Sequence, residues 1–247
     1  MNVFTAPLGE LAAYREIKEN IAHGKSVLAD SCVDPQKAHL LYALSREEDL
    51  AEGARLRLVL TDSEMQARAV AQDCLFYDRN VAVFPARDLI FYQADLRSGE
   101  IDRERLRCLR RILEGKPGTV VTTFAALLTP QVPVWVLQEN MLGIGHRDTV
   151  DLSEVTARLA AMGYERNYQV ERAGQFAVRG DILDIFDLTQ DNPVRIELWG
   201  DEVETIRSFD VLSQRSVEHL EYVRIFPATE MILDPRRLHD GLGRIRK

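Results

Sequence analysis

The residues that could act on a nucleotide lie between Ala29 and Lys37, where an apolar run meets a predicted helix. Turns of this kind bind phosphates in parallel-sheet proteins because the amides at a helix N-terminus converge there. A working phosphate loop also needs glycines and a lysine followed by Ser or Thr. This turn has no glycine, its Asp30 and Asp34 would repel phosphate, and Lys37 lies inside the predicted helix without a following Ser or Thr. We expect no ATP site here, because Asp34 instead caps a helix that begins at Pro35.

The other short motifs lack the context that their chemistry needs. The glycine pairs at 143–145 and 241–243 have no strand before and helix after them, so we interpret both as turns. The five histidines show neither metal-ligand spacing nor a neighbouring nucleophile motif. Three widely spaced cysteines without a CxxC pair indicate small buried residues rather than a zinc site or a disulfide framework: Cys32, Cys74 and Cys108. We expect no catalytic residue, metal or cofactor.

Charged residues at regular spacing are more informative. Aspartates recur at three-residue steps at Asp181, Asp184 and Asp187. In a strand that step puts neighbours on opposite faces, so solvation and turn formation explain them better than paired carboxylates. A predicted helix at 102–113 carries an arginine stripe opposite leucines, made of Arg103, Arg107, Arg110 and Arg111. The stripe could contact phosphates, but we favour a solvated face that acidic neighbours partly neutralise.

Three further arginines lie on or beside adjacent predicted strands: Arg166, Arg172 and Arg179. Arg179 alternates with Phe176 and Val178, so it faces outward if those two side chains face the core. Outward arginines near exposed aromatic residues such as Tyr168 or Trp199 are typical of protein-docking surfaces. Spacing alone leaves open whether these residues form such a surface.

The elements that must position these residues fall into two groups. Up to about residue 135, short apolar runs alternate with helical patterns, which predicts an α/β domain with a parallel sheet. The expected strands are 26–29, 57–60, 81–84 and 119–123, and the expected helices are 10–21, 35–44, one capped by Thr61 or Asp62 that runs to about Phe76, and 102–113.

The pattern changes near Pro130 and Pro133. One more helix is expected at 152–162, with Asp151 at its start and Gly163 at its end. Five strand-like segments with short turns then predict an antiparallel sheet: 167–178, 179–186, 194–200, 203–211 and 220–226. The expected organisation is an α/β domain at 1–136, an α+β domain at 137–227 and a basic stub at 228–247.

Composition limits the possible classes of protein. The 247 residues include 31 basic and 39 acidic side chains, a net charge of -8, which argues against a broad phosphate-binding surface. No apolar run reaches the ~20 residues of a membrane helix, and the first residues do not have the pattern of a secretory signal. We therefore expect a soluble cytoplasmic protein that does not bind a membrane.

A family resemblance emerges from YERNYQVERAGQFAVRGDILDIF, VRIELWGDEVETIRSFDVLSQRSVE and the later IFPA. These segments resemble the amino-terminal part of the transcription-repair coupling factors (Mfd), which is itself similar to the excision-repair subunit UvrB. The match is dense over residues 140–230, whereas residues 1–136 match mainly in the order of strands and helices. The resemblance implies a RecA-like domain with a degenerate P-loop, an inserted UvrA-binding domain, and a returning segment of the first domain from residue 228.

The resemblance also implies which residues bind a partner. In UvrB-like proteins, arginines of the inserted domain dock on UvrA, and the matching positions here are Arg166 and Arg179, with Arg172 nearby. A second strand arginine of the UvrB pattern falls on Ala177, which is a departure from that pattern. UvrB also has an intact Walker loop and a long aromatic-rich hairpin that grips damaged DNA. The corresponding stretch here, 85–93, is too short for that hairpin, so both differences favour the coupling factor.

The expectation is a non-catalytic module, a fragment of a longer protein, that recruits UvrA to RNA polymerase stalled at DNA damage. Polymerase and DNA would be contacted through domains outside this chain. The alternative is the N-terminal fragment of a UvrB-type ATP-dependent DNA-repair helicase acting in damage verification. A small-molecule α/β enzyme would require a pocket of convergent polar groups, which the sequence does not indicate.

Overall fold

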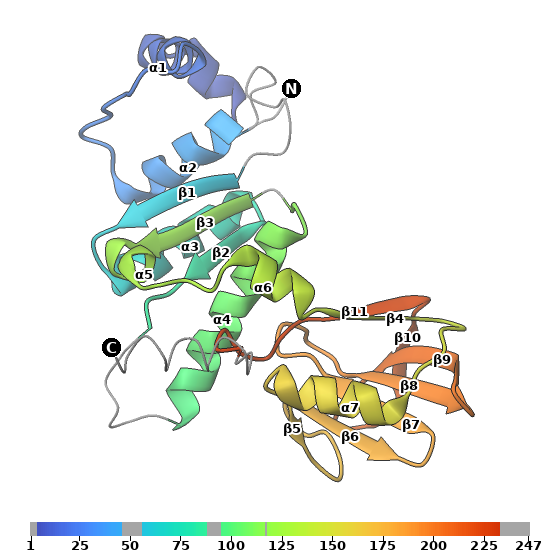
Figure 1. Ribbon diagram of the computed structural model, residues 1–247. Coiled ribbons are helices and arrows are strands. Elements are labelled where there is room, and N and C mark those ends of the chain that lie inside the picture. Colours follow the sequence, from blue (N-terminus) through green and yellow to red (C-terminus); the bar gives the residue numbers. More distant parts are fainter. Residues whose placement is uncertain (1–3, 46–55, 88–94, 117, 233–247) are drawn as a thin grey trace, which may run out of the picture. The chain divides into compact units, whose positions relative to one another are not determined.

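The computed structural model describes residues 4–45, 56–87, 95–116 and 118–232, and it divides into two units (Figure 1). The first unit contains the described residues up to 87 and from 111 to 129. The second contains residues 95–110 and 130–232. This division differs from the domains expected from the sequence, because residues 95–110 group with the second unit.

A parallel sheet forms the centre of the first unit. Its described strands are β1 (Leu56–Thr61), β2 (Val81–Phe84) and β3 (Gly118–Thr123), in the order β1-β3-β2. Val121 of β3 is fully buried against two small residues, Ala67 and Ala71, of helix α3 (Glu64–Tyr77). Small side chains let this helix pack closely on the sheet. The parallel α/β architecture expected from the sequence is therefore confirmed.

The remaining described helices of the first unit are η1 (Ala6–Glu10), α1 (Ala12–Ala22), α2 (Asp34–Ser45) and α5 (Phe124–Leu128). The prediction of a strand at 26–29 is wrong: these residues have no regular structure, and Leu28 is 91% exposed. An apolar run becomes a strand only where a neighbouring strand pairs with it. Helix α3 starts one to two residues later than expected, because the Ser63 side chain accepts the Gln66 amide.

The second unit contains a six-stranded sheet in the order β10-β9-β8-β7-β6-β5. Its strands are β5 (Glu165–Arg166), β6 (Gln175–Arg179), β7 (Ile182–Phe186), β8 (Val194–Trp199), β9 (Glu202–Phe209) and β10 (Ser216–His219). All neighbours are antiparallel except β5 and β6. One face packs with helix α7 (Leu152–Ala161) in the main core, where Leu159, Leu183 and Ile196 are fully buried.

Helix α7 starts at the residue expected from the sequence and ends one residue earlier than expected. The Asp151 carboxylate accepts the Ser153 hydroxyl and the amides of Ser153 and Glu154, and these bonds lower the pKa of Asp151. Gly163 follows the helix with a φ of +92°, and a Cβ there would lie 2.7 Å from Thr229 Cγ2. A residue without a side chain is therefore required at this position.

Two strands of the second unit pair with each other outside the six-stranded sheet. β4 (Leu142–Gly145) pairs antiparallel with β11 (Tyr222–Ile225), so the prediction of a turn at 143–145 is wrong. A Cβ on Gly143 would lie 2.0 Å from the Tyr222 hydroxyl, so this glycine makes room for the tyrosine ring. Helices α4 (Asp95–Leu113) and α6 (Val134–Glu139) complete the described elements. Three segments with predictions from the sequence lie outside the described residues. They are most of 85–93, the stub beyond residue 232, and the glycine pair at 241–243 within that stub.

Candidate protein-docking site

The face of the six-stranded sheet opposite the main core carries the first candidate site. Alternation places Phe176 in the core, so Ala177 and Arg179 of β6 lie on the other face. Asp184 of β7 is the register partner of both Ala177 and Arg195, so it lies on the same face. We call this the open face of the sheet, although a smaller cluster that includes Ala177, Phe186 and Phe209 is buried on part of it. The expectation that Arg179 lies away from the core face is confirmed.

Arg179 is not free on the open face, because it shares a buried carboxylate. The Arg179 Nη2 atom donates to Asp184 Oδ2 at 2.6 Å, and Arg179 is 33% exposed. Arg195 holds both oxygens of the same carboxylate, with Nε at 2.7 Å from Oδ1 and Nη2 at 2.8 Å from Oδ2. The bond to Asp184 raises the pKa of Arg195. Asp184 itself is 1% exposed, so two arginines compensate one buried negative charge.

Solvation is therefore the wrong explanation for two of the three aspartates, whereas the expected turn formation holds at Asp187, which accepts the Thr189 amide. Asp181 is exposed at the turn between β6 and β7. Asp184 and Asp187 are 1% and 2% exposed and pair with arginines. A carboxylate can be buried when it gains ion pairs and hydrogen bonds, and these partners come from distant parts of the sequence.

The other two predicted docking arginines lie at the β5 edge of the sheet. Arg166 is exposed and stands opposite Phe176 in the register, on the opposite side of the sheet from Arg179. Arg172 is also exposed, and its Nη2 lies 2.8 Å from Glu165 Oε2. No ion-pair partner is recorded for Arg166 within the described part of the chain. The structure thus brings the three arginines to β5, β6 and the connection between these strands, but not to one face.

Exposed aromatic side chains accompany these arginines. Tyr168 is 87% exposed in the connection between β5 and β6. Trp199 is 80% exposed at the end of β8, next to a hairpin whose Gly200 has a φ of +64°. Its neighbour Leu198 faces the core, so alternation puts Trp199 on the side of the open face. Large exposed aromatic groups are frequent contributors to protein interfaces.

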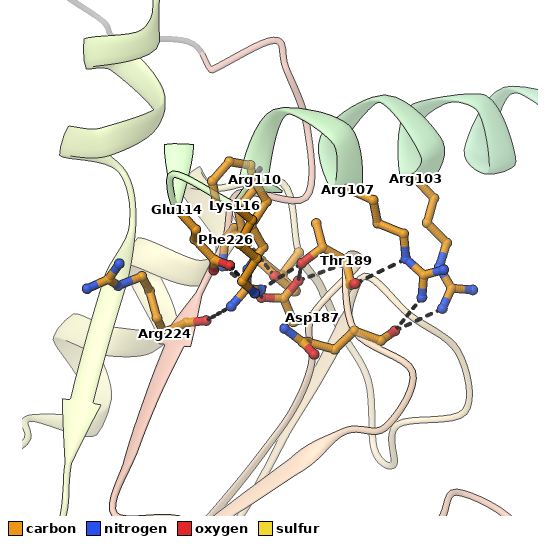
Figure 2. A network of polar contacts seen from close by, with 11 residues as sticks. Arg103, Arg107, Arg110, Glu114, Lys116, Asp187, Thr189, Arg224 and Phe226 are labelled. Atoms are coloured by element: carbon orange, nitrogen blue, oxygen red, sulfur yellow. Dashed lines mark hydrogen bonds and ion pairs between the residues drawn. The ribbon is translucent and has the colours of Figure 1, made fainter. Parts of the chain in front are cut away.

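The arginine stripe on α4 has a structural role that neither sequence interpretation included. Within the second unit, Arg103 Nη2 donates to the Gln190 carbonyl at 2.8 Å, and Arg107 Nε donates to the Thr189 carbonyl at 3.0 Å (Figure 2). Arg107 also pairs with Asp191. Burial lowers the pKa of Arg103, with a further contribution from Arg107. The favoured prediction of a solvated stripe is therefore wrong for these two residues.

Asp187 links α4 to the strands of the second unit. Its Oδ2 accepts Arg110 Nη1 at 3.0 Å and the Phe226 amide at 2.8 Å, and its Oδ1 accepts the Thr189 amide at 2.7 Å (Figure 2). The Phe226 carbonyl accepts the Tyr164 hydroxyl at 2.6 Å. Tyr164 is almost completely buried, which raises the pKa of its phenol well above the ordinary value. These groups fix the connection between α4, β7 and β11.

Arg105 is the principal charged residue that the sequence patterns missed. Its side chain is completely buried and donates to Glu230, with Nε at 2.7 Å from Oε1 and Nη2 at 3.1 Å from Oε2. The Gln131 side chain accepts a further bond at 2.6 Å. Arg105 lies beside Leu106 on the helix, and no local pattern distinguishes it from the solvated arginines nearby. Its partner is 125 positions away in the sequence.

The turn at residues 29–37 lies in the first unit. The Lys37 amine lies 2.8 Å from Asp34 Oδ1, and this contact raises the pKa of the lysine. Both side chains are more than half exposed. Asp34 is the first residue of α2 rather than the residue before it, so its predicted cap position is off by one. The lysine of this turn is therefore paired with an aspartate.

A cavity of about 290 Å³ in the second unit is lined by β4 and the start of α7. Two of its carboxylates already have structural partners, because Asp148 accepts the Gly145 amide at 2.6 Å and Asp151 caps the helix. Across the described ranges, no cluster of His, Cys, Asp and Glu could hold a metal. None of the helices in those ranges has the length and apolar character needed to cross a membrane. Cys74 and Cys108 are buried as expected, and Cys32 is partly exposed.

Comparison with known proteins assigns the second unit to a class. Residues 142–231 match the family model described as the UvrB interaction domain, so the chain contains a domain of that class. About three quarters of the chain is similar to each of two transcription-repair-coupling factors, from Bacillus subtilis (strain 168) and Staphylococcus aureus (strain MRSA252). The identities are 38% over 191 residues and 31% over 188 residues. The resemblance found in the sequence is therefore confirmed.

The similarity extends beyond the UvrB interaction domain. It covers 76% of this chain in the Bacillus protein and 75% in the Staphylococcus protein. In both cases the aligned part is 16% of the relative, so the chain spans about a sixth of the length of these relatives.

We predict that an acidic residue paired with an arginine of α4 contributes more to stability when it is buried than when it is exposed. Glu230→Gln removes the charge that compensates the completely buried Arg105, and breaking such a pair costs ~3–5 kcal/mol. Asp191→Asn removes a partner that is 87% exposed, and exposed pairs contribute ~0–1 kcal/mol. Urea denaturation of the two variants measures the difference in free energy of unfolding. Equal losses would contradict the structural role of Arg105.

Proposed function

We propose that this chain is a non-catalytic, UvrB-like module of a transcription-repair coupling factor, which recruits UvrA to RNA polymerase stalled at DNA damage. In this proposal the first unit is a RecA-like domain with a degenerate P-loop, and the second is the UvrA-binding domain inserted into it. RNA polymerase and DNA are contacted by other parts of the longer protein. The match of residues 142–231 to the UvrB interaction domain and the names of the relatives support this assignment.

The observation that carries the proposal is the guanidinium set at one end of the six-stranded sheet. Arg166 and Arg172 are exposed at the β5 edge, and Arg179 is partly exposed on the neighbouring strand. Arginine can bind a carboxylate through two parallel N–H bonds, which gives specificity to a contact with acidic groups. We propose that these three residues contact acidic groups of UvrA, with Tyr168 and Trp199 supplying apolar contact area beside them.

The accessibility of each arginine determines its role in docking. Arg166 is exposed and has no recorded ion pair within the described ranges, so it can form a new pair without breaking one. Arg172 must release or share Glu165, and Arg179 shares Asp184 with Arg195. Arg166 is therefore the most direct test, because its replacement leaves the internal pairs intact.

The second candidate function is the front part of a UvrB-type ATP-dependent helicase. It would require the turn at 29–37 to hold nucleotide phosphates. The turn has no glycine, and Lys37 is engaged by Asp34, whose negative charge would also repel phosphate. These features favour the binding module over the enzyme.

We expect Arg166→Glu to weaken UvrA binding at least tenfold, because losing a charge-assisted contact costs ~2 kcal/mol or more where the contact is desolvated. The melting temperature should not change, since the side chain is exposed. Calorimetric titration of the chain against purified UvrA measures the affinity. Arg15→Glu is the matched control, because it reverses an exposed arginine of α1 in the first unit. Unchanged binding by the Arg166 variant would contradict the proposed docking edge.

We also predict no measurable binding of ATP to this chain. The physical reason is the aspartate pair in the turn at 29–37, which replaces the glycines and free lysine of a working loop. Isothermal titration with ATP and magnesium provides the measurement. Binding in the micromolar range, lost in Lys37→Ala, would favour the helicase alternative.

A further inference from the structure

We infer that Asp184 and Arg195 are positioning residues, which hold the guanidinium of Arg179 in place for a carboxylate of the docking partner. This inference rests on the proposed UvrA docking and assigns roles to two residues that the sequence patterns did not select. It begins from strand geometry. Arg179, Asp184 and Arg195 come from the neighbouring strands β6, β7 and β8, all on the open face.

The contacts divide the two arginines into an inner and an outer one. Arg195 is 13% exposed and holds both carboxylate oxygens of Asp184. It also donates to Gln214 Oε1 at 3.0 Å, and its guanidinium lies 4.4 Å from the centre of the Phe209 ring. The N–H groups of its guanidinium are therefore occupied by contacts within the protein. Arg195 is the inner arginine, whose contacts orient the carboxylate.

Arg179 is the outer arginine. It is 33% exposed and uses one nitrogen, Nη2, for Asp184. In the described part of the chain, no acceptor is recorded for its Nε or Nη1. These donors are therefore available to a carboxylate of another protein. Because two cations share one anion, the three side chains together keep a net positive charge.

Fixing Arg179 in advance favours binding for an entropic reason. A long side chain that is free in solution must lose rotamer freedom when it binds, which reduces affinity. In this structure the 2.6 Å bond to a buried carboxylate has already ordered Arg179. Asp184 opposes binding only through its negative charge, which Arg195 compensates. We therefore expect orientation to outweigh the charge effect.

The test is a double-mutant cycle measured as UvrA affinity. Arg179→Ala should weaken binding about tenfold, and Asp184→Asn about fivefold, mainly through faster dissociation. In the Arg179→Ala background, Asp184→Asn should have no further effect on affinity, because the group that it positions is gone. Glu230→Gln is the control, since it breaks another buried ion pair of the second unit without touching the open face.

A second variant keeps the test valid if Asp184→Asn does not fold. Arg195→Lys retains the positive charge but loses the fork that binds both carboxylate oxygens. It should weaken UvrA binding when Arg179 is present and have no effect when Arg179 is alanine. Circular dichroism of each variant checks the fold before titration.

The outcomes separate this inference from the proposed function. If Asp184→Asn strengthens binding, leaves it unchanged, or weakens it equally in both backgrounds, Asp184 does not act through Arg179 and the inference is wrong. Arg179→Ala would still show whether Arg179 contacts UvrA. If Arg179→Ala alone leaves the affinity unchanged, the docking role proposed for Arg179 is wrong as well.

Discussion

The fold of the second unit depends on two buried carboxylates whose negative charges are compensated by arginines. One lies on β7 and the other just after it, on the opposite face. Asp184 faces the open side of the sheet and is held by Arg179 and Arg195. Asp187, three residues later, binds Arg110 and the Phe226 amide on the other side. A buried carboxylate without such partners would destabilise the fold by several kcal/mol. The arginines that pair with these carboxylates are therefore needed for the unit to fold, whatever else they bind.

The need to compensate these carboxylates determines which arginines remain available to a binding partner. Arg105, Arg110 and Arg195 are largely buried, and internal acceptors occupy them. Arg179 is shared between the protein and solvent, and Arg166 is exposed. A basic pattern in the sequence thus overstates the charge that the surface can offer. The stripe on α4 is the clearest example, because most of it binds the connection between β7 and β8 rather than a ligand.

Much of the fold follows from local sequence. Apolar runs with the period of a strand predict β1, β2 and β3, and Asp151 with Gly163 predicts the limits of α7. The segment 26–29 has the same local character but forms no strand in the structure. Strand formation depends on a pairing partner, which a local pattern does not contain.

The site is less predictable than the fold. Alternation along β6 correctly predicts the face of Arg179, and the family resemblance selects Arg166 and Arg179, with Arg172 nearby. The roles of Asp184, Asp187 and Arg105 depend on contacts between residues far apart in the chain. Arg110 and Asp187, for example, are separated by 77 positions. Single-residue spacing cannot distinguish a solvated aspartate from one that a distant arginine neutralises.

Hydrogen–deuterium exchange of this chain, with and without purified UvrA, tests the central claim most directly. The claim is that UvrA docks on the β5 edge and the adjoining open face of the second unit. The expected result is slower exchange on binding at residues 165–184 and 195–199, with no change in α1 or α3 of the first unit. Protection confined to the first unit would contradict the account.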